Sequence, residues 1–205
     1  ARITESVISS ESRSKLRVGK LSFLSEAGGK TRIIAIGDYW TQMALRPMHD
    51  IIMHVLKRME TDGTWNQDRQ TNRIARLAKG NVYSFDLSSA TDRFPIELQR
   101  YVVEALFGTE YSYWWKDILA NRWFHIPGGD PIKWETGQPL GMYSSWATFS
   151  LTHHLVIEFC AWKEGFRSFR SYAVLGDDVV IWNQRVASRY EKIMSSYGVS
   201  INKDK

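Results

Sequence analysis

The segment SYAVLGDDVVIWN, residues 171–183, places two adjacent carboxylates, Asp177 and Asp178, between two runs of apolar residues. Short runs rich in valine and isoleucine, separated by glycine and aspartate, are typical of buried β-strands joined by a tight turn. The segment therefore predicts a β-hairpin with the two acids at its turn. Adjacent carboxylates repel each other, so the folding of a buried strand by itself gives no reason to place them there.

A third acid, Asp86, ends another apolar segment, NVYSFD at residues 81–86. If this strand lies beside the hairpin in one sheet, three carboxylates meet at one end of that sheet. Mg²⁺ takes oxygen ligands and offsets such charge, and enzymes of phosphoryl transfer use pairs of these ions. An Asp-Asp pair is also common in ordinary turns, so the acids by themselves leave both interpretations open.

The composition fits a folded protein with an acidic partner. The 205 residues are 43% apolar and 24% charged, which is enough to build a core, and this length predicts one or two domains. The formal net charge of +5 favours nucleic acid as the partner. The single cysteine, Cys160, excludes a disulfide framework and a cysteine-based zinc site. No apolar run reaches the ~18 residues that a membrane span needs.

Hydrophobic spacing and turn residues predict an α+β fold, an antiparallel sheet backed by helices. Residues 1–20 are expected to form a polar, basic arm, and residues 61–68 a loop. Pro47 is expected to break or restart the helix in which it lies. Besides the hairpin, strands are predicted at 30–36, 82–86 and 199–202, helices at 40–59, 71–80, 95–106, 111–123, 145–162 and 186–197, and a hairpin turn at 127–131.

Several segments then resemble, in order, the motifs of a viral RNA-dependent RNA polymerase. The A, B and C motifs match SFDLSSATDRFP (84–95), GQPLGMYSSWATFSLTHH (137–154) and LGDDVVIW (175–182). The sequences of these motifs are most similar to those of the mitoviruses, small RNA replicons of mitochondria. Their basic finger motif matches GGKTRIIAIGDYWTQMALRPMHD (28–50), a further mitovirus segment matches TDGTWNQD (61–68), and the D motif begins at GVSINKDK (198–205).

This resemblance implies a polymerase palm, a ferredoxin-like antiparallel sheet backed by helices, with partial fingers and without the thumb. Residues 1–80 would form the partial fingers with the basic triphosphate-binding segment, and residues 81–205 the palm. The implied function is RNA-templated RNA synthesis in viral RNA replication, by nucleotidyl transfer with two Mg²⁺ ions, or Mn²⁺ in their place. The implied partners are template RNA, nascent RNA and ribonucleoside triphosphates, and the implied location is the mitochondrion. Complete members of the family are several times longer, so this chain is expected to be a fragment that is inactive in isolation.

The resemblance also implies roles for single residues. Asp86 and Asp177 match the two metal-binding catalytic acids, with Asp178 as a supporting ligand, and Asp92 matches the acid that reads the ribose 2′-OH. The remaining matches are Gly137 and Gly141 in the template loop, Ser144 and Ser145 at the nucleotide, Lys30 and Arg32 at the triphosphate with Lys20 and Arg46 as further candidates, and Lys205 as general acid with Lys203 as its alternative.

The sequence departs from the family pattern at SLTHH, where many polymerases carry an asparagine. His153 and His154 stand there instead. Adjacent helical positions point apart, so core packing or an orienting hydrogen bond is expected rather than a metal site. Two alternatives stay open: a reverse transcriptase or intron maturase, which Asp92 and GDD oppose, and an inactive mitovirus-derived remnant in a host mitochondrial genome.

Overall fold

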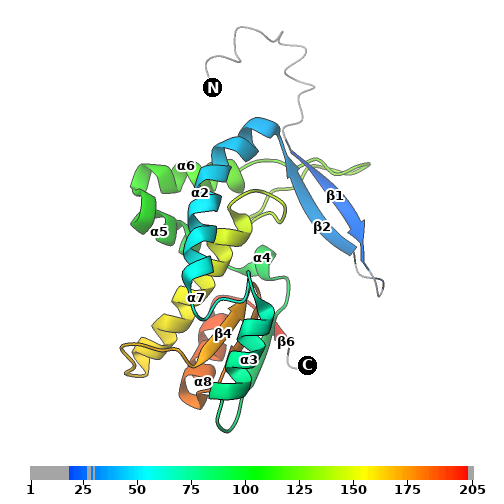
Figure 1. The fold of residues 1–205 in the computed structure, drawn as a ribbon. Coiled ribbons are helices and arrows are strands. Elements are labelled where there is room, and N and C mark those ends of the chain that lie inside the picture. The colour runs from blue at the N-terminus through cyan, green and yellow to red at the C-terminus, as the bar shows by residue number, and fades with distance from the viewer. Residues whose placement is uncertain (1–18, 27–28, 30, 203–205) are drawn as a thin grey trace, which may run out of the picture.

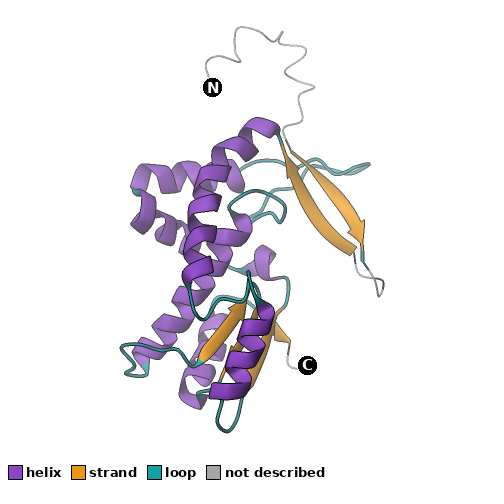
Figure 2. Cartoon of the chain, viewed as in Figure 1, coloured by secondary structure: helices purple, strands orange, loops and turns teal. Residues whose placement is uncertain are grey.

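The computed structural model describes residues 19–26, 29 and 31–202. A helical body has a projecting β-hairpin on one side and a small β-sheet below it, and the long helix α7 (Ser145–Lys163) runs from the body down to the sheet (Figures 1 and 2). Three of the residues with predicted roles, Lys30, Lys203 and Lys205, lie outside the described residues.

The projecting hairpin consists of β1 (Gly19–Ser25) and β2 (Thr31–Gly37), which pair antiparallel over their whole length. The sequence predicted β2 and missed β1. Most of β1 is exposed or half-buried, so it lacks the apolar alternation that marks a strand in sequence. Its hydrogen bonds to β2 define it instead.

Helix α2 (Tyr39–Arg58) begins at Asp38, whose carboxylate accepts a hydrogen bond from the Thr41 amide at 3.0 Å. The predicted break at Pro47 is wrong, because the helix continues through it. Proline removes one backbone hydrogen bond, but the flanking residues hold the helix by packing. Leu45 and Met48 are both buried in the core of the helical body.

The helical body also contains α5 (Ile96–Phe107) and α6 (Thr109–Leu119). The long helix α7 (Ser145–Lys163) is buried on nearly all sides, as expected of a helix that is apolar all round. It contributes Ala147 and Leu151 to the core of the helical body, and Phe149 and Ile157 to the core beneath the sheet. One rigid element therefore connects the two cores.

The sheet has four antiparallel strands in the order β4-β5-β3-β6. Their bounds are β3 (Tyr83–Leu87), β4 (Tyr172–Leu175), β5 (Asp178–Ile181) and β6 (Ile201–Asn202). Helices α7 and α8 (Gln184–Ser196) pack on one face, and α3 (Gln67–Leu77) lies on the other side along β4 (Figure 1). The predicted antiparallel sheet backed by helices is confirmed.

The segment before α3 extends this sheet. The Gly63 amide donates to the Val174 carbonyl at 2.7 Å, and the Val174 amide donates to the Thr61 carbonyl at 2.9 Å. Helix α3 then begins after Asn66, whose side chain accepts from the Arg69 amide at 2.8 Å. The predicted loop at 61–68 is thus partly wrong, because pairing with β4 and this cap give it regular structure.

The predicted division into residues 1–80 and 81–205 stays a prediction. The core beneath the sheet takes all its members from residues 85–199, whereas the core of the helical body takes members from both sides of residue 80. Among the helices that the structure describes, none is long and apolar enough to cross a lipid bilayer.

Candidate active site

The strand register brings the predicted acids together on one face of the sheet. Asp86 of β3 lies opposite Asp178 of β5, Asp178 lies opposite Leu175 of β4, and Asp86 lies opposite Asn202 of β6. Residues directly opposite each other in antiparallel strands point to the same face. These four residues therefore form a row across all four strands, which we call the acid row.

The acid row faces away from the helices α7 and α8. In β5, Asp178 is exposed, whereas the next residue, Val179, is 1% exposed and belongs to the core beneath the sheet. In β3, Phe85 and Leu87 enter the same core on either side of Asp86. This alternation follows from the two-residue period of a strand, and it directs both carboxylates outward.

Gly176 and Asp177 form the two-residue turn between β4 and β5. Gly176 has φ +60°, and such hairpin turns need a positive φ that glycine adopts without strain. A Cβ at this position would lie 2.0 Å from the Trp146 ring. Both the backbone angle and the contact therefore require glycine immediately before the two acids.

The three carboxylates affect one another electrostatically. Burial is the largest cause that raises the pKa of Asp177, and the negative charges of Asp178 and Asp86 raise that pKa further. The positive charge of Arg32 acts in the opposite direction and lowers it. Arg32, which also pairs with Glu26 at 2.7 Å, is thus close enough to the acids for its charge to act on Asp177.

The donor set of the site is suited to a hard divalent cation. Three carboxylates from the acid row and its turn offer the oxygen ligands that Mg²⁺ prefers, and their mutual repulsion is what a cation would relieve. Within the described part of the chain, however, no three His, Cys, Asp or Glu side chains are already arranged to hold a metal ion. The three carboxylates therefore suit a divalent cation chemically, and their side chains would have to reorient when the cation binds.

Asp92 lies just after β3, in the short helix α4 (Ala90–Arg93), with its side chain exposed. Its carboxylate accepts a hydrogen bond from the Trp134 indole at 2.8 Å. The Trp134 ring packs edge-on against Phe124 with centroids 5.1 Å apart. The sequence offered no sign of this contact, because 42 residues separate the two partners.

The glycine-rich loop before α7 packs against α4 and β2. A Cβ on Gly137 would lie 2.1 Å from the Thr91 carbonyl, and the Gln138 amide donates to the same carbonyl at 2.8 Å. Gly141 has φ +107°, and a Cβ there would lie 2.6 Å from the Ala35 carbonyl. The loop therefore connects the segment after Asp86 with the hairpin that carries Arg32.

The two serines that follow the loop are buried away from solvent. Ser144 is 0% exposed and its hydroxyl accepts a hydrogen bond from the Trp115 indole at 2.9 Å, while Ser145 is 1% exposed. His49 of α2 accepts from the Ser144 amide at 3.3 Å. Both side chains are thus buried in this structure, and their predicted role at the nucleotide stays a prediction.

The two histidines of α7 make separate hydrogen bonds, as the predicted orienting role requires. His153 is 0% exposed, and its ring nitrogens lie 2.7 Å from the Gly176 carbonyl and 2.6 Å from the Tyr190 hydroxyl. Burial lowers the pKa of His153 to about 4. Burial also raises the pKa of Tyr190, so both side chains are neutral at pH 7.

His154 connects α7 to the segment that extends the sheet. Its Nε2 lies 3.1 Å from a carboxylate oxygen of Asp62, and its Nδ1 lies 3.1 Å from the Tyr172 hydroxyl. Asp62 is 2% exposed. The sequence marked the TDGTWNQD segment as mitovirus-like, but nothing in it indicated that Asp62 would be buried against this histidine.

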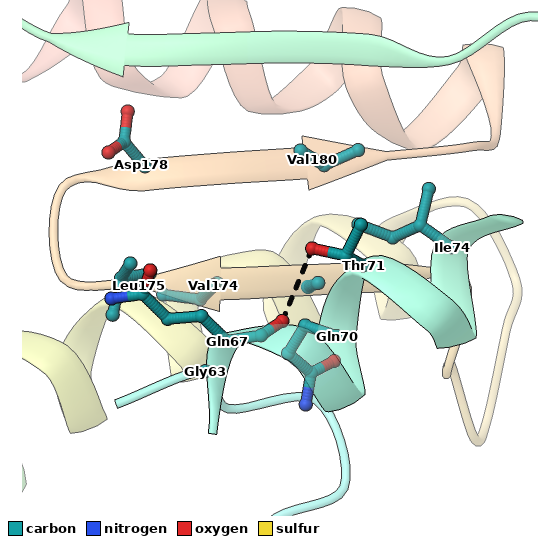
Figure 3. Close-up of a pocket in the computed structure, with 10 residues that line it drawn as sticks. Gly63, Gln67, Gln70, Thr71, Ile74, Val174, Leu175, Asp178 and Val180 are labelled. Carbon is teal, nitrogen blue, oxygen red and sulfur yellow. Dashed lines mark hydrogen bonds between the residues drawn. The ribbon is translucent and has the colours of Figure 1, made fainter. Parts of the chain in front are cut away.

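A cavity of about 170 Å³ lies beside the acid row, between α3 and the β4–β5 hairpin (Figure 3). Gln67, Thr71 and Ile74 line it from the helix, and Val180 and Asp178 from the sheet. The Thr71 hydroxyl donates to the Gln67 carbonyl at 3.3 Å. One of the three acids therefore borders a cavity on the outer face of the sheet.

The fold is that of part of a palm-containing polymerase. A mutant RNA-dependent RNA polymerase of a human picorbirnavirus, with its insertion loop deleted, matches with a TM-score of 0.70. The match covers 91% of this chain and 41% of that chain at 16% sequence identity, so it concerns the fold alone.

The sequence comparisons specify the family within that class. The family model described as "Mitovirus RNA-dependent RNA polymerase" matches residues 1–205, and the chain belongs to that family. It is 37% identical over 192 residues to the RNA-directed RNA polymerase of Cryphonectria parasitica mitovirus 1, covering 92% of this chain and 24% of that protein. The chain thus spans about a quarter of the length of this viral relative.

A plant relative is closer in length. The chain is 39% identical over 158 residues to an uncharacterized mitochondrial protein of Arabidopsis thaliana. That match covers 73% of this chain and 76% of the plant protein. Sequences similar to this chain therefore occur among plant mitochondrial proteins as well as in viruses.

Proposed function

We propose that this chain carries the catalytic acids of a mitovirus-type polymerase that extends RNA on an RNA template in viral replication. The acid row carries the proposal, since it places Asp86 and Asp178 side by side next to the turn residue Asp177. Membership of the mitovirus polymerase family supports the reaction and its substrates, ribonucleoside triphosphates and RNA.

In this proposal Asp86, Asp177 and Asp178 hold two Mg²⁺ ions, which Mn²⁺ can replace. When bound, such ions activate the attacking hydroxyl and stabilise the charge of the leaving group. The raised pKa of Asp177 supports the assignment, because burial and, after it, the negative charges of Asp178 and Asp86 raise this pKa, and a bound cation would offset both effects. The protein's own contribution is to hold Asp177 and Asp178 at the turn of the β4–β5 hairpin, with Asp86 beside them on β3.

Residues outside the acid row also have proposed roles in substrate binding. Arg32, whose charge acts on Asp177, would offset the negative charge of the triphosphate, together with Lys30. Asp92 would accept a hydrogen bond from the ribose 2′-OH, and Trp134 would orient its carboxylate through the 2.8 Å hydrogen bond. Gly137 and Gly141 would let the loop backbone approach the template.

The experiment that tests the metal site is a titration of residues 1–205 with Mn²⁺, followed by electron paramagnetic resonance. Asp86→Asn and Asp177→Asn should each weaken binding by about tenfold or more, because a ligand charge is lost. Asp130→Asn, in an exposed loop, is the matched control and should leave the affinity unchanged. Equal affinity of all four proteins would contradict the proposed site.

Synthesis itself is tested in a chimera, in which this chain replaces its matching segment of the Cryphonectria mitovirus polymerase. We expect Mg²⁺-dependent extension of a primed RNA template, and a loss of several orders of magnitude with Asp177→Asn. Retention of near-normal synthesis by the variant would overturn the catalytic assignment.

The Arabidopsis match favours a second candidate function. A plant mitochondrial protein of similar length supports the view that the chain is a mitovirus-derived remnant that functions, or merely persists, in mitochondria without catalysis. A chimera that binds RNA and Mn²⁺ but extends no primer would favour this candidate. In either case we propose the mitochondrion as the location.

A further inference from the structure

His153 is a buried polar side chain to which the proposed function assigns no role. It lies in the middle of α7, surrounded by the aromatic rings of Phe94, Phe149 and Tyr190 at centroid distances of 5.7–6.1 Å. Burying an imidazole among such rings is unfavourable unless its nitrogens are hydrogen-bonded. Both nitrogens have partners at 2.6–2.7 Å.

The partners determine which nitrogen carries the proton. The Gly176 carbonyl can only accept, so the Nδ1–H of His153 donates to it at 2.7 Å. The Nε2 of the neutral ring is then an acceptor, and the Tyr190 hydroxyl donates to it at 2.6 Å. The hydrogen bonds therefore run in one direction, from Tyr190 through His153 to Gly176.

The end of this chain of hydrogen bonds is the peptide that precedes the first acid of the turn. Because a peptide unit is planar, holding the Gly176 carbonyl also holds the amide of Asp177. Trp146, two helical turns before His153 on α7, contacts the same glycine, whose added Cβ would lie 2.0 Å from its ring. Two residues of one rigid helix thus hold the turn.

We propose that His153 is a positioning residue: its Nδ1–H, oriented by Tyr190, holds the Gly176–Asp177 peptide so that Asp177 and Asp178 can bind a divalent cation. This inference rests on the proposed function, in which these acids are metal ligands. It also accounts for the SLTHH segment, in which the first histidine holds the turn and the second holds Asp62.

Two substitutions separate positioning from mere packing. In His153→Asn the side-chain NH₂ takes the place of Nδ1 and can still donate to Gly176, while Tyr190 loses its acceptor. In His153→Gln the longer side chain reaches toward Tyr190, while Gly176 loses its donor. Each variant leaves one buried group without its partner, so a purely structural role predicts similar losses of stability and of Mn²⁺ affinity for both.

The measurement is the Mn²⁺ titration of residues 1–205, with thermal unfolding of each variant alongside. If His153 positions the turn, His153→Gln should weaken Mn²⁺ binding by about tenfold, which corresponds to the free energy of one such hydrogen bond. His153→Asn should stay within about threefold of the unsubstituted chain. Equal affinities of the two variants, whether both unchanged or both reduced, would overturn the inference.

The Asp177→Asn variant distinguishes a failure of the proposed metal site from a failure of the positioning role of His153. If Asp177→Asn binds Mn²⁺ as well as the unsubstituted chain does, the proposed function fails in that respect. The hydrogen-bond chain is then tested alone, by ¹⁵N nuclear magnetic resonance of the His153 ring. A proton on Nδ1 with a shifted Gly176 carbonyl resonance supports it, and a proton on Nε2 overturns it.

Discussion

Two residues close to the acid turn, His153 of α7 and Asp177 of the turn itself, have pKa values that burial shifts from their ordinary values. His153 has a pKa of about 4 in the folded chain, against an ordinary value of 6.5, because the imidazolium would be desolvated. Asp177 shows the opposite shift, since burial and neighbouring carboxylates raise its pKa. As the pH falls, the folded chain therefore takes up a proton at Asp177 more readily than an ordinary aspartate does, and at His153 less readily than an ordinary histidine does.

The shift of His153 predicts a loss of stability in acid. Above pH 6.5 the ring is neutral in both states, and between pH 6.5 and about 4 only the unfolded chain binds the proton. The free energy of unfolding should thus fall by about 3 kcal/mol over this interval and level off below it. Urea denaturation of the unsubstituted chain and of His153→Asn at pH 7, 5.5 and 4 measures the difference.

In that comparison the other groups near His153, namely His154, Asp177 and Tyr190, are the same in both proteins. The variant should therefore show a smaller fall in stability between pH 7 and pH 4. Parallel pH dependences of the two proteins would show that His153 is not buried as a neutral ring.

Gly137 should tolerate no side chain. Its added Cβ would lie 2.1 Å from the Thr91 carbonyl oxygen, a backbone atom that cannot move away by a change of rotamer. We expect Gly137→Ala to lower the free energy of unfolding by about 1–3 kcal/mol, as forced overpacking does. Gly129→Ala is the control, because its nearest neighbour would be an Ile126 side-chain atom at 3.5 Å. Similar stabilities of the two variants in urea would contradict the close approach.

Asp92 should control sugar selection. A site built to bond a hydroxyl discriminates strongly against the analogue that lacks it. In the chimeric polymerase, Asp92→Ala should therefore reduce the preference for ribonucleotides over deoxyribonucleotides by about a hundredfold. Trp134→Phe should reduce it less, because the carboxylate remains and only its orienting hydrogen bond is lost. Single-nucleotide incorporation kinetics give both ratios, and an unchanged preference in Asp92→Ala would exclude the role.

At the scale of elements, α3 is anchored to the sheet by a buried guanidinium. Arg73 donates to the Tyr172 carbonyl at 2.7 Å and to the Arg170 carbonyl, and it pairs with Glu60 at 3.3 Å. Tyr172 is the first residue of β4. One side chain therefore connects α3 to the start of the strand that leads to the acid turn.

Removing this anchor should destabilise the sheet side of the molecule. Arg73→Met keeps the apolar length of the side chain but leaves two carbonyls without their donor, and we expect a loss of about 2–4 kcal/mol. Arg76→Met, at an exposed position of the same helix, is the control and should change little. Urea denaturation compares them, and equal midpoints would exclude the anchoring role.

Elements whose apolar residues follow one period were predicted from sequence, and elements defined by contacts were not. The β4–β5 hairpin and α7 match their expected positions closely. The strand β1 was missed because it depends on pairing with β2, and the break at Pro47 was wrong because packing preserves α2. Helix α4 was also missed, since four residues are too few for a helical period.

At the scale of the whole molecule, the chain covers 24% of its viral relative. A net charge of +5 gives only modest overall attraction to RNA, and the affinity from phosphate contacts falls steeply with salt. We therefore expect residues 1–205 alone to bind RNA weakly and to add at most traces of nucleotide in Mg²⁺ or Mn²⁺. Primer extension resolved on a gel tests this, and long products that Asp177→Asn abolishes would contradict it.

The sequence by itself determined the residue types of the site and their place at strand ends, because strand alternation and turn chemistry act over a few neighbouring residues. Only the tertiary structure decided that Asp86 lies opposite Asp178, that Ser144 is buried, and that His153 holds Gly176. Register and hydrogen-bond partners depend on the packing of segments far apart in the chain, and such packing leaves no local period in the sequence.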